Sequence, residues 1–431
     1  MKKRVDISIV NGHLIDPGNG IDQPQDVHIS RGKILAIGAK PDDFEAELVI
    51  DARGQIVCPG LVDLNSRLRE PGHEHKATIA SETAAAASAG ITTLLCQPDT
   101  QPVTDTTAVV ELIRRQWKNA GKARVIPLAA MTQNLAGTEI SEMHALQKAG
   151  CVAVSNAGKP LNNTLVQRRA MEYAATFGLQ VFIKSEDRHL RNQGCVHEGA
   201  VASRLGLPAY PEAAETVAVA RDITLAEATG ACLHFQTLST ANSLRKIEHA
   251  ISDGIALSAD VAAHQLHLTE MDIDGFNANC HVDPPLRTLR DRDALRAAVA
   301  SGLISAICSD HQPHDRDAKA HPFPDSEAGI SALETLLPLT LKLVTEGIID
   351  MSTAIARLTC GPADIAGLPY GRLTPGLSAD VCIFNADSVW QFEADRMLSK
   401  GKNTPFDGWE FAQRVTHTIF EGRLVYQADS E

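Results

Sequence analysis

The stretch PGLVDLNSRLREPGHEHKATIASETAAAASAGITTLLCQPDTQPVTD, residues 59–105, decides the fold. It opens with a short apolar run, GLVDL at 60–64, and a second run, TTLLC, follows at 92–96. Between them lies an alanine-rich stretch at 79–89 with helical character. A strand, a helix and a second strand in this order predict the first unit of an α/β fold.

The same alternation continues to about residue 368. Six further short apolar runs follow at 125–130, 151–155, 181–185, 232–236, 257–261 and 304–309. The predicted helices between and after these runs cover 106–119, 165–177, 211–229, 239–252, 291–300 and 333–346. Eight strands separated by helices or long connections are typical of a (β/α)₈ barrel, which we place at 59–374.

Both ends of the chain have a different pattern. The first 58 residues contain short alternating strands separated by turns such as Asn11-Gly12. After Pro375, strand patterns return in ADVCIFNAD (379–387) and RVTHTIFEGRLVYQ (414–427). We therefore predict a small β-sandwich built from residues 1–58 plus 375–431, lying beside the barrel.

Composition and charge narrow the classes of function. A net charge of −13 repels phosphate backbones, so we expect no nucleic-acid partner. No apolar stretch approaches the ~20 residues that span a bilayer, and the N-terminus lacks the apolar core of a signal peptide. The nine cysteines form no CxxC pair, which indicates free thiols in a reducing compartment. We predict a cytoplasmic protein without a membrane partner.

Residues 59–105 closely resemble the first barrel unit of class I dihydroorotases. So do DPPLR at 283–287, SDHQPH at 309–314 and KNTPF at 402–406, in the same order along the chain. The resemblance covers essentially the whole sequence and extends to the wider amidohydrolase superfamily. It implies a barrel whose active members hold zinc at the C-terminal face of the strands and hydrolyse or close a cyclic amide.

The resemblance also identifies the positions at which the family holds its metal. In this chain they are Asn65, Arg67, Asn156, Lys184, Thr237 and Asp310. The family has histidines at four of these positions and an acid at or beside Asn156, and only Asp310 keeps the expected residue type. Since protonated lysine and arginine offer no lone pair to a cation, the substitutions predict that no metal or other cofactor binds.

Loss of the metal would remove most of the chemistry. A bound metal lowers the pKa of water from 15.7 to roughly 7, which is worth about 12 kcal/mol as an upper bound. Asp310 alone would be a residual base, and we interpret it as an ion-pair partner of Arg67 or Lys184. No catalytic residue is therefore expected.

Part of the substrate pocket is retained in vestigial form. Arg69 matches the arginine that holds the substrate carboxylate in the family. Asp99 and Asp283 stand at positions that contact the substrate, and we expect their negative charge to repel an anion such as dihydroorotate. His311 and His314 match positions in the family's last strand motif, and we interpret them as polar contacts rather than metal ligands.

Two other pairs of histidines could be read as metal sites. His73 and His75 form a His-x-His pattern on a loop after Pro71-Gly72, where a relocated metal site is the alternative interpretation. His264 and His267 are three residues apart, and we expect them at the surface. With 16 histidines in the chain, such pairs arise by chance.

The functional hypothesis follows from the replacement of the family's metal-binding histidines. The NSRLREPG stretch at 65–72 resembles a dihydroorotase branch that lacks the metal histidines and associates with aspartate carbamoyltransferase. The resemblance implies a non-catalytic assembly subunit of pyrimidine biosynthesis, with aspartate carbamoyltransferase as partner and a homodimer as the expected state. Two alternatives stay open. One is an active cyclic-amide hydrolase with a rearranged metal site, and the other is a ligand-binding regulatory subunit.

Overall fold

A ring of parallel strands forms the centre of the protein. The computed structural model describes residues 5–428. The strands of the ring, in chain order, are β8 (Leu61–Ser66), β9 (Ile91–Cys96), β10 (Arg124–Pro127) with β11 (Ala129–Ala130), β12 (Ala153–Ser155), β13 (Gln180–Ile183), β16 (Leu233–Phe235), β17 (Leu257–Ala262) and β18 (Ala306–Cys308). Each pairs with its neighbours in parallel, and His311, just beyond β18, closes the ring by bridging to Ser66 of β8.

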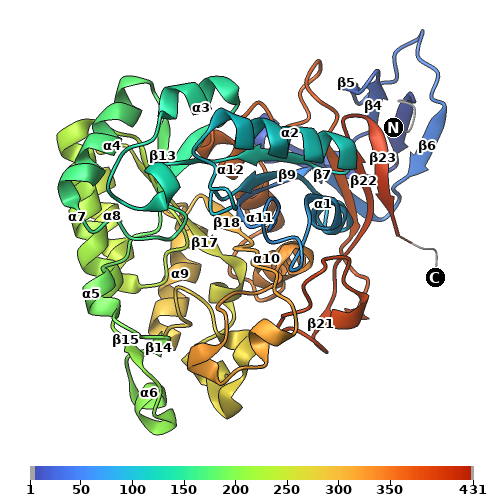
Figure 1. Ribbon diagram of the computed structural model, residues 1–431. Coiled ribbons are helices and arrows are strands. Elements are labelled where there is room, and N and C mark those ends of the chain that lie inside the picture. The colour runs from blue at the N-terminus through green and yellow to red at the C-terminus, as the bar shows by residue number, and fades with distance from the viewer. Residues whose placement is uncertain (1–4, 429–431) are drawn as a thin grey trace.

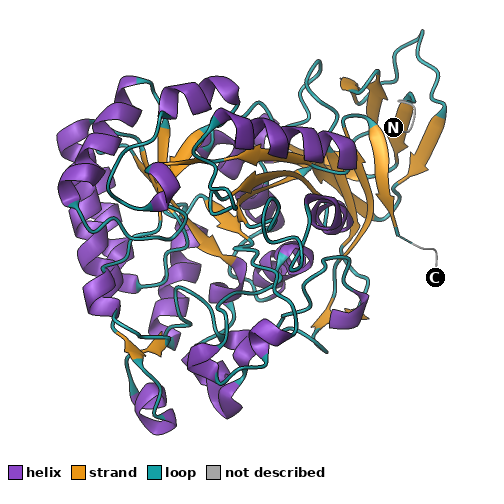
Figure 2. Ribbon diagram, viewed as in Figure 1, coloured by secondary structure: helices purple, strands orange, loops and turns teal. Residues whose placement is uncertain are grey.

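Helices surround this ring on the outside (Figures 1 and 2). The longer ones are α1 (Ile79–Ser88), α2 (Thr107–Ala120), α4 (Thr164–Thr176), α7 (Ala213–Thr229), α8 (Ala241–Ser252), α9 (Leu289–Ser301) and α10 (Leu336–Thr345). They match the seven predicted helices to within a few residues. The structure adds α3 (Met143–Ala149), α11 (Met351–Leu358) and α12 (Cys360–Ile365), which the sequence pattern did not single out.

Local chemistry explains where several of these helices begin. Thr78, Asn163, Thr240 and Thr288 each accept a hydrogen bond from a backbone N–H in the first turn of the following helix. In α1 the buried face consists largely of alanines, which lets the helix lie close to the strands.

Strands from both ends of the chain form the second part of the fold. One sheet has the order β5-β4-β1-β6 and the other the order β23-β22-β19-β7-β2-β3. Their bounds are β1 (Ile7–Val10), β2 (His13–Asp16), β3 (Ile21–Pro24), β4 (Val27–Ser30), β5 (Lys33–Ile37), β6 (Leu48–Asp51), β7 (Gln55–Pro59), β19 (Val381–Asn385), β22 (Arg414–Phe420) and β23 (Arg423–Gln427). Antiparallel pairing of β7 with β19 joins the two ends, and the first and last described strands, β1 and β23, both lie on this side of the molecule (Figure 1).

An apolar core of its own holds the two sheets together, with Ile7, Leu14, Val57, Val381 and Ile419 among its fully buried residues. The predicted fold class, a (β/α)₈ barrel with a β-sandwich formed by both termini, is therefore confirmed. The exact domain boundaries remain a prediction, and residues 1–4 and 429–431 of the predicted sandwich range lie outside the described residues. None of the helices within residues 5–428 has the length and apolarity that crossing a bilayer requires.

Close contacts join the barrel to the sandwich. The buried Arg124 at the start of β10 pairs with Asp380, its Nη1 lying 2.9 Å from the carboxylate Oδ2. Gly90, between α1 and β9, has φ +79°, and a Cβ placed there would lie 2.4 Å from Sγ of Cys382 in β19. Gly90 is thus required both by its backbone conformation and by the approach of the sandwich.

A pair of glycine substitutions tests this junction. Gly90→Ala should lower the free energy of unfolding by roughly 2 kcal/mol or more, since it adds a steric clash to an unfavourable φ. Gly178→Ala is the matched control, because Gly178 has φ +64° but no atom within 4 Å of the added Cβ. It should cost about 1 kcal/mol from backbone strain alone. Urea unfolding measures both, and equal losses would show that the contact with Cys382 contributes nothing.

Candidate functional site

The predicted metal positions converge at the C-terminal ends of the barrel strands. Five of the six line one small cavity, together with four further residues, and the full lining is Asn65, Arg67, Gln97, Gly158, Lys184, Gln236, Thr237, Asp283 and Asp310. The sixth, Asn156, lies beside it and accepts a 3.4 Å hydrogen bond from the backbone N–H of Lys184. The cavity has a volume of about 10 Å³, which is the space of roughly one water molecule.

The side chain of Arg67 lines this cavity and is held by three neighbouring residues. Its Nε donates to Oδ2 of Asp99 at 2.7 Å, and its Nη1 lies 3.6 Å from Oδ1 of Asp310. Its Nη2 donates to the backbone carbonyl of Ala157 at 3.2 Å. The Arg67 side chain is 12% exposed, so a nearly buried cation links residues that follow β8, β9, β12 and β18.

Lys184 also lines this cavity. Its Nζ lies 2.6 Å from Oδ1 of Asp283 and 3.8 Å from Oε2 of Glu186. Arg191, in the short helix α5 (Arg188–Arg191), adds a second cation to both acids, with its Nη1 at 2.9 Å from Glu186 and 3.0 Å from Asp283. Two acids and two bases therefore form a closed ion-pair network at the cavity.

Asp310 accepts hydrogen bonds rather than standing free. Nδ2 of Asn65 donates to its Oδ1 at 2.9 Å, and the Nε2 of Gln312 contacts both oxygens at 3.2 and 3.3 Å. Burial raises the pKa of Asp310 to about 6, although the charges of Arg67 and Lys184 act in the opposite direction. Asp310 is thus the one carboxylate of the cavity whose pKa lies near neutrality.

Asn156 and Thr237, the other two positions at which we expected the family's metal ligands, form hydrogen bonds that involve the backbone. The amide Nδ2 of Asn156 donates to the carbonyl of Lys159 at 2.7 Å. The backbone N–H of Thr237 donates to Oδ1 of Asp260 at 2.6 Å. Both residues are buried. Their side chains offer neutral amide and hydroxyl oxygens, which are weak metal donors compared with a carboxylate or an imidazole.

The expected repulsion of an anion by Asp99 and Asp283 needs correction. Burial alone would raise the pKa of Asp283, but Lys184 and Arg191 outweigh it and hold the pKa at about 2. The pKa of Asp99 is likewise lowered, because Arg67 and Arg69 outweigh the effect of burial. Both acids are ionised, but each is matched by a cation within 3 Å. Paired in this way, they present little net negative charge to a ligand.

The residues of the vestigial pocket are also engaged. Arg69 donates from Nε to the carbonyl of Pro313 at 3.0 Å, and its Nη2 lies 3.1 Å from Nε2 of His314. Burial, with the charges of Arg69 and Lys76, lowers the pKa of His314 to about 2, so this imidazole is neutral. His311 accepts from the backbone N–H of Ala332 at Nδ1 and contacts Glu82 at 2.8 Å through Nε2. These side chains hold loops together and do not line the cavity.

The other two histidine pairs lie apart from the strand-end cavity. His73 and His75 lie on a loop with ring centroids 6.2 Å apart, and His75 approaches Asp315 at 3.7 Å. The expectation that His264 and His267 lie at the surface was wrong, because both are buried, and His267 contacts the carbonyl of Leu339 at 2.8 Å. Within residues 5–428, no three His, Cys, Asp or Glu side chains are grouped so as to hold a metal ion.

Sequence reasoning missed several residues of the cluster. Gln97, which directly follows the second apolar run, donates to Oδ1 of Asn65 at 2.9 Å. Glu186 stands two residues after Lys184, so its place in a KSED motif was a usable signal. Arg191 could not be predicted from the sequence. Nothing in the sequence indicates that the short helix after β13 directs this side chain toward Asp283.

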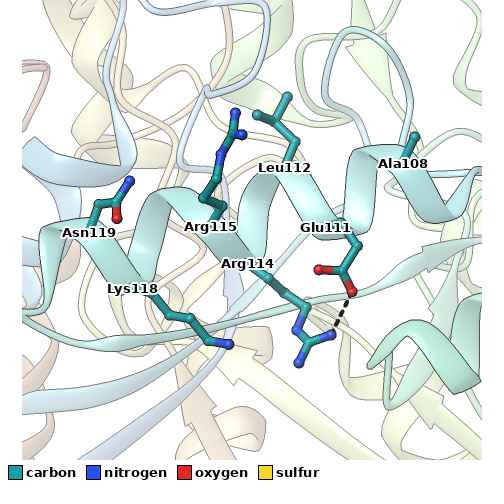
Figure 3. Close-up of a pocket in the computed structure, with 7 residues that line it drawn as sticks. All are labelled: Ala108, Glu111, Leu112, Arg114, Arg115, Lys118 and Asn119. Atoms are coloured by element: carbon teal, nitrogen blue, oxygen red, sulfur yellow. Dashed lines mark hydrogen bonds and ion pairs between the residues drawn. The ribbon is translucent and has the colours of Figure 1, made fainter.

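A larger hollow lies elsewhere and has no connection with the strand ends. It has a volume of about 700 Å³ and is lined only by residues of α2, among them Arg114, Arg115 and Lys118. Figure 3 shows these side chains extending from the two sides of one helix, with Glu111 paired to Arg114. They belong to the outer surface of the barrel, and none of them is a nucleophile with a general base beside it. The strand-end cluster therefore remains the candidate site.

Comparison with known proteins fixes the family. The family model described as dihydro-orotase-like matches residues 54–243. A dihydroorotase-like protein of Pseudomonas putida is 46% identical, covering 97% of this chain and 99% of its own. The chain belongs to the dihydroorotase-like family. A relative named dihydroorotase, from Geobacter metallireducens, is 40% identical over 98% of this chain and 100% of its own length.

Solved structures agree on the fold of this dihydroorotase-like chain. The L-hydantoinase (dihydropyrimidinase) from Arthrobacter aurescens superposes with a TM-score of 0.87 at 24% identity, covering 98% of this chain and 96% of its own. A D-hydantoinase superposes with a TM-score of 0.84 at 22% identity, covering 98% and 95%. These structures share the barrel and the sandwich, and at this identity the likeness extends to the fold alone.

Removing the charge of Arg67 tests the energetics of the cluster. Arg67→Met should lower the free energy of unfolding by about 3 kcal/mol, because Asp99 and Asp310 lose their nearest cation. The double variant Arg67→Met/Asp99→Asn should recover part of this loss. Arg169→Met is the control, since this exposed arginine pairs with Glu172 at the surface and should change stability by less than about 0.5 kcal/mol. An Arg67 variant as stable as the control would refute the predicted role of the ion pairs.

Proposed function

We propose that this dihydroorotase-like chain is not a hydrolase and instead serves pyrimidine biosynthesis as an assembly subunit of aspartate carbamoyltransferase. The observation that carries the proposal is the ion-pair cluster at the strand ends. Arg67 and Lys184, each paired with an acid within 3 Å, lie where the family holds its metal. Their charges and their volume both oppose binding of a cation.

The donor set does not fit zinc. Zinc sites in proteins use sulfur, imidazole nitrogen or carboxylate oxygen, usually from at least three residues. Of the six family positions, Asp310 alone supplies one of these, and it is already hydrogen-bonded to Asn65 and Gln312. Two unit charges of like sign at 4 Å repel by about 4 kcal/mol at an effective dielectric constant near 20, and a divalent cation doubles this. The acids that pair with Arg67 and Lys184 offset part of this repulsion, but a metal ion would have to compete with both cations for those acids.

The size of the cavity also argues against a bound substrate. Small-molecule sites in proteins usually enclose roughly 300–1,000 Å³, whereas this one measures about 10 Å³. Making room for a pyrimidine ring would require separation of buried ion pairs, at a cost of several kcal/mol for each acid left without its cation. The ion pairs therefore favour the closed arrangement.

Asp310 is the strongest argument for residual catalysis. A pKa of about 6 suits a general base at neutral pH, and positioned acid–base groups contribute about 10²–10⁴-fold to a rate. That is well short of the activation that a metal-bound hydroxide supplies. With room for only about one water molecule beside it, Asp310 has no substrate to act on.

We propose aspartate carbamoyltransferase as the partner because of a sequence resemblance. The NSRLREPG stretch at 65–72 resembles the dihydroorotase branch that lacks metal histidines and associates with aspartate carbamoyltransferase. An assembly role needs a stable fold and an exposed surface rather than an open pocket, so it is compatible with a closed strand-end cavity. We extend the proposal to a cytoplasmic complex in which this chain forms a homodimer.

Metal content and turnover test the loss of catalysis. After equilibration with zinc and desalting, the protein should retain far less than one zinc per chain and should not convert dihydroorotate or carbamoyl aspartate. The Geobacter metallireducens relative named dihydroorotase, treated in parallel, is the positive control. Stoichiometric zinc together with turnover would refute the proposal and favour a hydrolase with a rearranged site.

Co-expression tests the partner. The chain and the aspartate carbamoyltransferase of its own organism, produced together, should elute as one large species whose mass is measured by light scattering. The transferase should be active in that species and should lose activity or assembly when expressed without this chain. Two separate peaks, with full transferase activity in both preparations, would contradict the assembly role.

A further inference from the structure

A second pocket lies directly outside the closed cluster. It has a volume of about 620 Å³, and most of its lining comes from segments that follow three barrel strands: residues 158–162 after β12, residues 186–195 after β13 and residues 324–328 after β18. Leu135, Ala136 and His281 complete the lining. Gly158 borders both this pocket and the small cavity beneath it. Its volume is within the usual range for a small-molecule site. The barrel mouth therefore keeps an open outer chamber above a filled inner one.

Charge in this outer chamber is predominantly positive. Lys159, Arg188 and Arg191 line it, and Glu186 is the only acid among its lining residues. Glu186 is already bound by Nη1 of Arg191 at 2.9 Å and by the hydroxyl of Tyr210 at 3.1 Å. Lys159 and Arg188 are exposed, and neither forms an ion pair with the acids of residues 5–428. A chain of net charge −13 thus presents a local excess of about two positive charges here.

The lining is also rich in hydrogen-bond donors. Only Nη1 of Arg191 is engaged by Glu186 and Asp283, so within the described part of the chain its Nε and Nη2 keep donors to offer. Asn162, Asn192 and Gln193 add exposed side-chain amides around the rim. A guanidinium edge with neighbouring amides and an ammonium group suits an oxyanion with several acceptor oxygens.

One wall of the chamber supplies a different group. Ser326 donates its hydroxyl proton to the carbonyl of Phe323 at 2.8 Å, so its oxygen accepts from Nδ1–H of His281 at 2.9 Å. Burial, with the charge of Lys319, lowers the pKa of His281 to about 4 and keeps the imidazole neutral. The Nε2 of this ring is then an acceptor. It can receive a hydrogen bond from a hydroxyl group of a ligand.

We propose that this outer chamber binds a small phosphorylated metabolite, such as a sugar phosphate. The phosphate dianion would lie among Arg188, Lys159 and the free edge of Arg191, and a hydroxyl group would donate to His281. A phosphate matches the two excess charges and offers more acceptor oxygens than a monocarboxylate. The inference rests on the volume, charges and hydrogen-bonding groups of the outer chamber, so it holds whether or not the chain has catalytic activity.

Calorimetric titration with ribose 5-phosphate, and with inorganic phosphate as the minimal probe, tests the site. The wild-type protein should bind one molecule per chain, and added salt should weaken binding. Lys159→Glu and Arg188→Glu should each weaken it by about tenfold or more, because they turn an attraction into a repulsion. Both residues are exposed, so the variants should fold, and circular dichroism checks this.

Arg53→Glu is the matched control, since it reverses an exposed charge in the sandwich and should leave affinity unchanged. Absence of saturable binding at millimolar concentrations would overturn the proposal. So would equal binding by the double variant Lys159→Glu/Arg188→Glu, or succinate binding as tightly as ribose 5-phosphate. The assay measures neither zinc nor dihydroorotate turnover, so its failure is distinguishable from failure of the proposed function.

Discussion

The guanidinium of Arg67 is the interaction on which the strand-end site depends. It lies beyond β8 and draws together Asp99 after β9, Ala157 after β12 and Asp310 after β18. A buried charge is costly unless it is paired and hydrogen-bonded, and here each of its three nitrogens faces an oxygen. One cation thereby joins four strand ends of the barrel.

Lys184 and Arg191 repeat this arrangement nearby, where two acids and two bases neutralise one another. Ion pairs between neighbouring segments therefore hold the cluster together. The ion pairs leave only a small inner cavity at the strand ends. Above it, the segments that carry Lys159 and Arg188 line an open chamber with a net positive charge. The closed inner cavity and the open outer chamber are thus neighbours at the strand ends.

Much of this could be read from the sequence. Periodic apolar runs predicted the barrel, and the strand patterns at both ends predicted the sandwich, because buried strands and helices leave local signatures. Long-range pairing was partly accessible, since Arg67 was expected near Asp310. The neutralisation of Asp99 and Asp283 was not, because it depends on which cation each loop brings within 3 Å. His264 and His267 were misjudged for a similar reason: histidine has an intermediate preference for burial, and spacing says nothing of what packs over it.

Anomalous diffraction at the zinc absorption edge, from crystals of the protein soaked in zinc, tests the central claim most directly. We expect no anomalous peak at the C-terminal ends of the strands, and we expect electron density that joins Arg67 to Asp99 and Lys184 to Asp283. A peak bound there by protein atoms, with either cationic side chain turned away, would contradict the account.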